Sequence, residues 1–81
     1  MRSTLTIGEF ATLTRLSVRT LRRYHAAGLL EPDTVDASTG YRYYAPAQIP
    51  TAQVIHQLRQ LDVPLAEIET ILAADDAQQR A

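Results

Sequence analysis

The residues best suited to chemistry are the arginines that recur along one short segment, residues 17–28. If this segment is a helix, Arg19, Arg22 and Arg23 lie three or four positions apart and share one continuous face. A solvated surface helix would usually mix both charge signs, whereas no acid interrupts this segment. The pattern therefore favours a helix that offers guanidinium groups to a polyanion such as DNA. Apolar and aromatic side chains occupy the opposite face: Val18, Leu21, Tyr24 and His25.

Other chemistry finds little support in the sequence. The chain has no cysteine, which excludes disulfides, thiolate metal ligands and cysteine nucleophiles. His25 and His56 are the only histidines, and neither lies in a cluster with the spacing of metal ligands. Ser17 has no candidate base beside it, and no glycine-rich loop is present to bind a phosphate cofactor. We therefore expect no enzyme, no cofactor and no metal site.

Length and charge describe a small single domain with an uneven charge distribution. The 81 residues carry a net charge of −1, but residues 1–44 hold six arginines and four acids. Residues 45–81 hold two arginines and five acids, so the N-terminal half is the one expected to face an anion. Neither a signal peptide nor a transmembrane stretch is recognisable, which leads us to expect a cytoplasmic protein without a membrane partner.

The elements that must position the arginines begin with a helix-turn-helix pattern. Thr6 and Glu9 have the spacing of a capping box, which predicts a helix over residues 7–13. Ser17 is a favourable N-cap for the arginine helix, and Gly28 suits its left-handed C-terminal end. Two short helices joined so closely are typical of a helix-turn-helix whose second helix reads DNA.

A small β-hairpin is predicted after this pair of helices. Residues Leu30–Thr34 and Tyr41–Tyr44 flank a polar segment rich in turn formers, with Gly40 at its end. Alternation of side chains along the second strand indicates that either Tyr43 or Tyr44 is buried. Because a two-stranded ribbon is unstable by itself, we expect it to pack on the helices.

Two further helices are predicted in the second half of the chain. Pro46 suits a helix start, but Pro50 would disrupt a helix that began there, so we expect a later start near Ile49 or a distorted first turn. Pro64 separates this helix from the last one. From residue 73 onwards the apolar stripe is lost, and the chain either frays or begins a longer helix. The two helices are expected to bury Ile49, Ala52, Ile55, Leu58 and Leu61, then Leu65, Ile68, Ile71 and Leu72.

Taken together, these motifs resemble the DNA-binding domain of the MerR family of bacterial transcription regulators. The resemblance covers residues 5–72 and rests on several motifs in the family's order and spacing. The motifs are residues 6–11 (TIGEFA), 16–22 (LSVRTLR), Tyr24, residues 28–32 (GLLEP), 40–44 (GYRYY), 58–61 (LRQL), and Leu65, Glu67 and Ile68.

The resemblance implies a mainly α fold, a winged helix-turn-helix with a small β-hairpin wing and then a helix pair that acts as a second wing. Residues 1–75 would form this domain, and residues 76–81 would be a tail or the start of a missing dimerisation helix. Family members bind as homodimers to double-stranded promoter DNA between the −35 and −10 elements. They distort that spacer so that RNA polymerase can engage both elements.

The resemblance also implies roles for particular residues. Arg19 and Arg22 would reach the major groove, Tyr24 a phosphate, and Tyr41 and Arg42 the backbone from the first wing. Arg59 is a candidate phosphate contact from the helix pair. The full set of candidate DNA-binding residues is Ser17, Arg19, Thr20, Arg22, Arg23, Tyr24, Tyr41, Arg42 and Arg59.

The chain departs from the family pattern at a few places. Arg23 stands where an aromatic residue is usual and His25 where an acid is usual, and both changes make the helix more positive. Pro50 and Pro64 are also unusual in the second wing. The family's long dimerisation helix and effector domain are absent, so we expect either a fragment of a longer regulator or a small stand-alone relative.

The residues are also compatible with two other functions. One is an excisionase-like architectural factor that bends DNA during recombination and shares this fold. The other is a protein-interaction module that uses its acidic half as the contact surface. DNA binding separates this last possibility from the other two.

Overall fold

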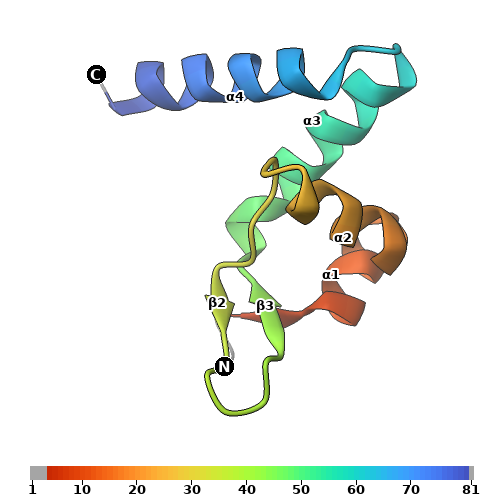
Figure 1. Cartoon of the computed structure of the whole chain (residues 1–81), viewed down its shortest axis with the longest axis vertical. Helices are drawn as coiled ribbons and strands as arrows, with labels where there is room; N and C mark the ends of the chain where they lie inside the picture. Colours follow the sequence, from red (N-terminus) through yellow and green to blue (C-terminus); the bar gives the residue numbers. More distant parts are fainter. Residues whose placement is uncertain (1–3, 81) are drawn as a thin grey trace.

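The computed structural model describes residues 4–80, and the side chains of residues 4–74. Helices dominate, and a small antiparallel sheet lies at the end of the molecule opposite α4 (Figure 1). The last helix, α4, extends from the far end of α3, away from the sheet. In chain order the elements are β1 (Leu5–Thr6), α1 (Ile7–Thr14), α2 (Val18–Ala26), β2 (Thr34–Val35), β3 (Arg42–Tyr44), η1 (Pro46–Gln48), α3 (Ile49–Gln60) and α4 (Leu65–Arg80).

The predicted capping box starts α1. The Thr6 amide donates to Glu9 Oε1 at 2.9 Å, and the Glu9 amide donates to Thr6 Oγ1 at 3.1 Å. The helix ends at Thr14, one residue later than predicted, where the buried Thr14 hydroxyl donates to the Phe10 carbonyl at 2.8 Å. Arg15 then takes a left-handed conformation with φ 62°, which turns the chain sharply towards α2.

Both ends of α2 are fixed by the residues that the sequence indicated. The Thr20 amide donates to Ser17 Oγ at 3.0 Å, so Ser17 is the N-cap. Gly28 has φ 75°, which a side chain would make costly, and its amide donates to the His25 carbonyl at 2.9 Å. The Leu29 amide donates to the Tyr24 carbonyl at 2.9 Å. This pair of bonds is a Schellman motif, and it ends the helix.

The wing differs from the predicted hairpin in two ways. Its first strand is Thr34–Val35 rather than Leu30–Thr34, because Leu30 is buried in the core instead of pairing. The prediction also missed β1, which pairs with the other edge of β3 and gives the strand order β1-β3-β2. A two-residue strand before a capping box has no periodicity to reveal it.

The core joins the four α-helices and β3 around an aromatic pair. The rings of Phe10 and Tyr44 stack with centroids 4.5 Å apart and planes 13° from parallel, which ties α1 to β3. Tyr44 is therefore the buried member of the two tyrosines, while Tyr43 is only half-buried. The other fully buried large side chains come from α2, α3 and α4: Leu21, Ile55 and Ile68.

The second helix pair starts as expected but buries less than predicted. A 3₁₀ turn, η1, holds Pro46, and α3 begins at Ile49 with Pro50 in its first turn, where no backbone hydrogen bond is lost. The prediction was wrong for Leu61, which is 75% exposed because the helix ends at Gln60. It was also wrong for Ile71, which is 45% exposed on α4.

Candidate nucleic-acid interface

The outer face of α2 is the most strongly cationic helix face in the described structure. Arg19, Arg22 and Arg23 are all exposed, whereas Leu21 and Tyr24 on the other side are buried in the core. This is the division of faces predicted from the sequence. Because the buried side and both caps hold the helix, the three guanidinium groups project from a fixed element.

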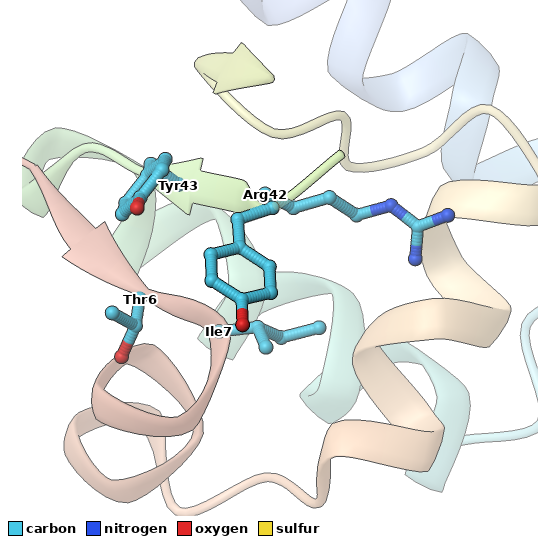
Figure 2. Close-up of a pocket in the computed structure, with 5 residues that line it drawn as sticks. Thr6, Ile7, Arg42 and Tyr43 are labelled. Carbon is cyan, nitrogen blue, oxygen red and sulfur yellow. The ribbon is translucent and has the colours of Figure 1, made fainter. Parts of the chain in front are cut away.

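The wing brings an aromatic and a cationic side chain next to α2. Tyr41 is 66% exposed, and Arg42 is half-buried at the start of β3. Figure 2 shows the Arg42 side chain extending from β3 towards the ribbon of α2, while Thr6 and Tyr43 lie at the opposite side of the view. A hollow of about 230 Å³, which we call the strand hollow, lies between the start of α1 and β3. Its lining residues are Thr6, Ile7, Tyr41, Arg42 and Tyr43.

A second hollow joins the wing to α2 directly. This helix–wing hollow measures about 210 Å³ and is lined by Ile7, Arg22, Gly40, Tyr41 and Arg42. Arg22 from α2 and Arg42 from β3 therefore face one depression of the surface, although they are 20 positions apart in the chain. The Arg42 guanidinium and the Tyr41 phenol can bind a phosphodiester backbone at the edge of a groove, and Arg22 of α2 lies beside them.

The turn of the wing is held by one carboxylate. Asp36 Oδ1 accepts hydrogen bonds from the Ser38 amide at 2.8 Å, the Ser38 hydroxyl at 2.7 Å and the Thr39 amide at 3.1 Å. The hydrogen bonds from Ser38, with those from Thr39, lower the pKa of the Asp36 carboxyl. Gly40 follows with φ 76°, which returns the chain to β3.

A third hollow lies between α2 and α3, and we call it the α2–α3 hollow. It measures about 250 Å³, and its lining residues are Thr20, Arg23, Tyr24, His56, Arg59 and Gln60. Burial raises the pKa of Tyr24, an effect that the positive charges of Arg59 and Arg23 oppose. The phenol therefore stays neutral at physiological pH, and its O–H can donate a hydrogen bond to an anion.

The nine predicted site residues fall into groups that the structure brings together unequally. Arg22, Tyr41 and Arg42 meet at the helix–wing hollow. Thr20, Arg23, Tyr24 and Arg59 meet at the α2–α3 hollow. Arg19 and Ser17 are exposed on α2 but line neither hollow.

Some of these side chains also have structural partners. The Ser17 hydroxyl donates to Thr20 Oγ1 at 2.9 Å while Ser17 caps the helix. Arg59 Nη1 donates to the Val63 carbonyl at 2.9 Å across the end of α3. A guanidinium has five N–H groups, so this bond leaves donors of Arg59 for another acceptor.

Sequence reasoning missed several lining residues of the three hollows: Thr6, Ile7, Gly40, Tyr43, His56 and Gln60. His56 could have been found, because it lies three positions before Arg59 and therefore shares its helix face. The role of Ile7 could not, because it depends on how β1 and the wing pack.

Among the described residues, no group of three or more histidines and acids has the geometry to hold a metal ion. In the same part of the chain, no helix combines the length and apolar character needed to cross a membrane.

Comparison with known proteins points to one family. Residues 5–75 match the family model of the MerR HTH family regulatory proteins. The transcriptional regulator BrlR of Pseudomonas aeruginosa is 46% identical over 77 residues, which cover 91% of this chain but only 28% of BrlR. The chain thus spans about a quarter of the length of this relative.

Solved structures share the fold. The transcription regulator PbrR691 from Ralstonia metallidurans, in complex with lead(II), superposes with a TM-score of 0.79 at 29% identity, over 91% of this chain and 57% of that one. HiNmlR, a MerR family regulator lacking the sensor domain and bound to promoter DNA, superposes with a TM-score of 0.77. It is 23% identical over 91% of this chain and 55% of its own, so its likeness concerns the fold alone.

Proposed function

The chain belongs to the MerR HTH family of regulatory proteins, and from that premise we propose that it binds double-stranded promoter DNA as part of a transcriptional regulator. The observation that carries the proposal is the helix–wing hollow, where Arg22 of α2 and Arg42 of β3 meet. A basic helix face and a basic wing on one surface suit a duplex, because a helix fits the major groove while the wing contacts the adjacent backbone.

The side chains divide by what they can recognise. Arg19 and Arg22 are proposed to read base edges, since a guanidinium bonds guanine with two hydrogen bonds. Contacts to phosphate or sugar fix the register without reading sequence. To these contacts we assign Ser17, Thr20, Arg23, Tyr24, Tyr41, Arg42 and Arg59.

The activity of the whole regulator is a further part of the proposal. We propose that it acts as a homodimer, distorts the promoter spacer and meets RNA polymerase at the promoter, in the cytoplasm. Residues 1–75 are proposed as the DNA-binding domain, and the backbone of residues 76–80 continues α4. The matched relatives are named as regulators, which favours this role over an excisionase-like factor.

Footprinting and titration test the proposal. The chain should protect DNA in the spacer between promoter elements, whereas protection at recombination attachment sites would contradict a regulatory role. Arg22→Ala should weaken specific binding by about 1–3 kcal/mol, or roughly 5- to 150-fold, because it removes a bidentate base contact. Thr70→Glu on exposed α4 is the charge-matched control, since it lowers the net charge by the same amount. Equal binding by the Arg22→Ala variant and the control would refute the groove assignment.

A further inference from the structure

The α2–α3 hollow contains a histidine, His56, that is not among the proposed DNA contacts. His56 is half-buried and lines the hollow with Arg23 from α2 and Arg59 from its own helix. Its backbone is firmly placed, because Ala52 and Ile55 on the inner face of α3 are fully buried. The imidazole therefore lines a fixed depression of the surface together with two arginines.

The charges around His56 come from two helices. Arg23 and the phenol of Tyr24 face it from α2, and Arg59 faces it from α3. The elements packed most closely against α3, namely α1, η1 and α4, contribute no residue to the lining. Among the described side chains the hollow thus contains no carboxylate, and hydroxyl and amide groups from Thr20 and Gln60 complete it. Such a set of donors fits a phosphate oxyanion.

We propose that the α2–α3 hollow holds one backbone phosphate of bound DNA and that His56 supplies a third cation to it, so that DNA affinity rises on acidification. The proposal rests on the proposed DNA-binding function and adds a regulation to it. Histidine is the residue whose charge ordinarily changes near neutral pH, and a phosphate favours the imidazolium form because the two attract each other.

The sign of the effect follows from linkage. If bound DNA favours the protonated ring, then protonation favours bound DNA by the same free energy. The affinity for DNA is highest at a pH where the His56 ring is protonated in both the free and the DNA-bound protein. It falls as the pH rises and the ring loses its proton. The gain is that of one partly exposed charge-assisted hydrogen bond, which corresponds to about 3- to 10-fold in affinity.

The test uses the 81-residue chain and a mixed-sequence duplex of about 30 base pairs, since phosphate contacts do not depend on sequence. Fluorescence anisotropy at about pH 6 and about pH 8, at equal ionic strength, should show tighter binding at the lower pH. His56→Gln should remove most of this difference. His25→Gln, which alters the other histidine and lies outside the hollow, should keep it.

Failure of the proposed function and failure of the role of His56 give different results. If the chain binds no duplex at both pH values, the proposed function itself is refuted. Binding without pH dependence, or pH dependence that survives in His56→Gln, would refute only the role of His56. If that variant does not fold, ring resonances of His56 in the wild-type chain decide the question. The duplex should keep the ring protonated to a higher pH, and an unchanged titration would overturn the proposal.

Discussion

The two helices α2 and α4 differ in how completely this chain fixes them. The shorter helix, α2, has side-chain and backbone caps at its two ends and a sharp division between buried and exposed faces. The longer helix, α4, buries only Ile68 completely among its described side chains and leaves Ile71 45% exposed. Positive charge is concentrated on α2, while Glu67 and Glu69 are exposed on α4. Capping and burial thus hold the helix that presents the arginines more firmly than they hold the described part of α4.

The largest expected effect is on stability, from truncating the buried face of α2. Leu21→Ala should cost about 2–5 kcal/mol in the free energy of unfolding, because it leaves a cavity at a fully buried site. Ile71→Ala on α4 should cost less than about 1 kcal/mol, because the side chain is already partly hydrated. Urea unfolding followed by circular dichroism measures both values, and similar costs would remove the contrast between the helices.

A smaller effect should come from the N-cap of α2. Ser17→Ala should cost about 1 kcal/mol in unfolding free energy, since it removes the acceptor of the Thr20 amide. Ser17→Asp keeps an acceptor at the same place and should restore most of the loss. If the alanine and aspartate variants unfold at the same urea concentration, the cap contributes nothing to the rigidity of the helix.

The wing should contribute to affinity without contributing to sequence preference. Tyr41→Phe removes one phenol hydroxyl from an exposed ring, so affinity should fall by no more than about 1.5 kcal/mol, or roughly 10-fold. The loss should be equal on all duplexes, as anisotropy titrations on several sequences can show. A loss confined to one sequence would mean that the wing reads bases, as α2 is proposed to do.

The smallest effect concerns the turn of the wing and pH. Because hydrogen bonds lower the pKa of the Asp36 carboxyl, its stabilisation of the turn is complete above the ordinary pKa of aspartate. That stabilisation should be lost as the pH falls through the lowered pKa. Amide resonances of Ser38 and Thr39 should report the loss, and Asp36→Asn should weaken the response. An unchanged response in that variant would contradict the assignment.

Much of the fold and of the candidate site could be predicted from the sequence, because these features depend on residues close together in the chain. The capping box at Thr6, the N-cap at Ser17 and the left-handed Gly28 each involve residues within a few positions of one another. The two faces of α2 follow from helical periodicity alone. The delayed start of α3 also followed locally, from the place of Pro50.

The remainder depends on contacts between distant segments. Pairing of Leu5 with Tyr44 creates β1, and nothing near Leu5 in the chain indicates it. Leu61 continues an apolar stripe but follows the end of its helix, so periodicity predicted burial where the structure has exposure. The meeting of Arg22 with Arg42, and of Arg23 with His56, needed the tertiary fold.

Mapping the DNA contact surface tests the central claim most directly. Amide and side-chain resonances of the 81-residue chain can be followed while a duplex with the promoter spacer sequence is added. The account predicts that the largest changes occur on the outer face of α2, the wing and the α2–α3 hollow, with residues 66–74 of α4 little affected. Large changes confined to α4, with Arg19, Arg22 and Arg42 unaffected, would contradict it.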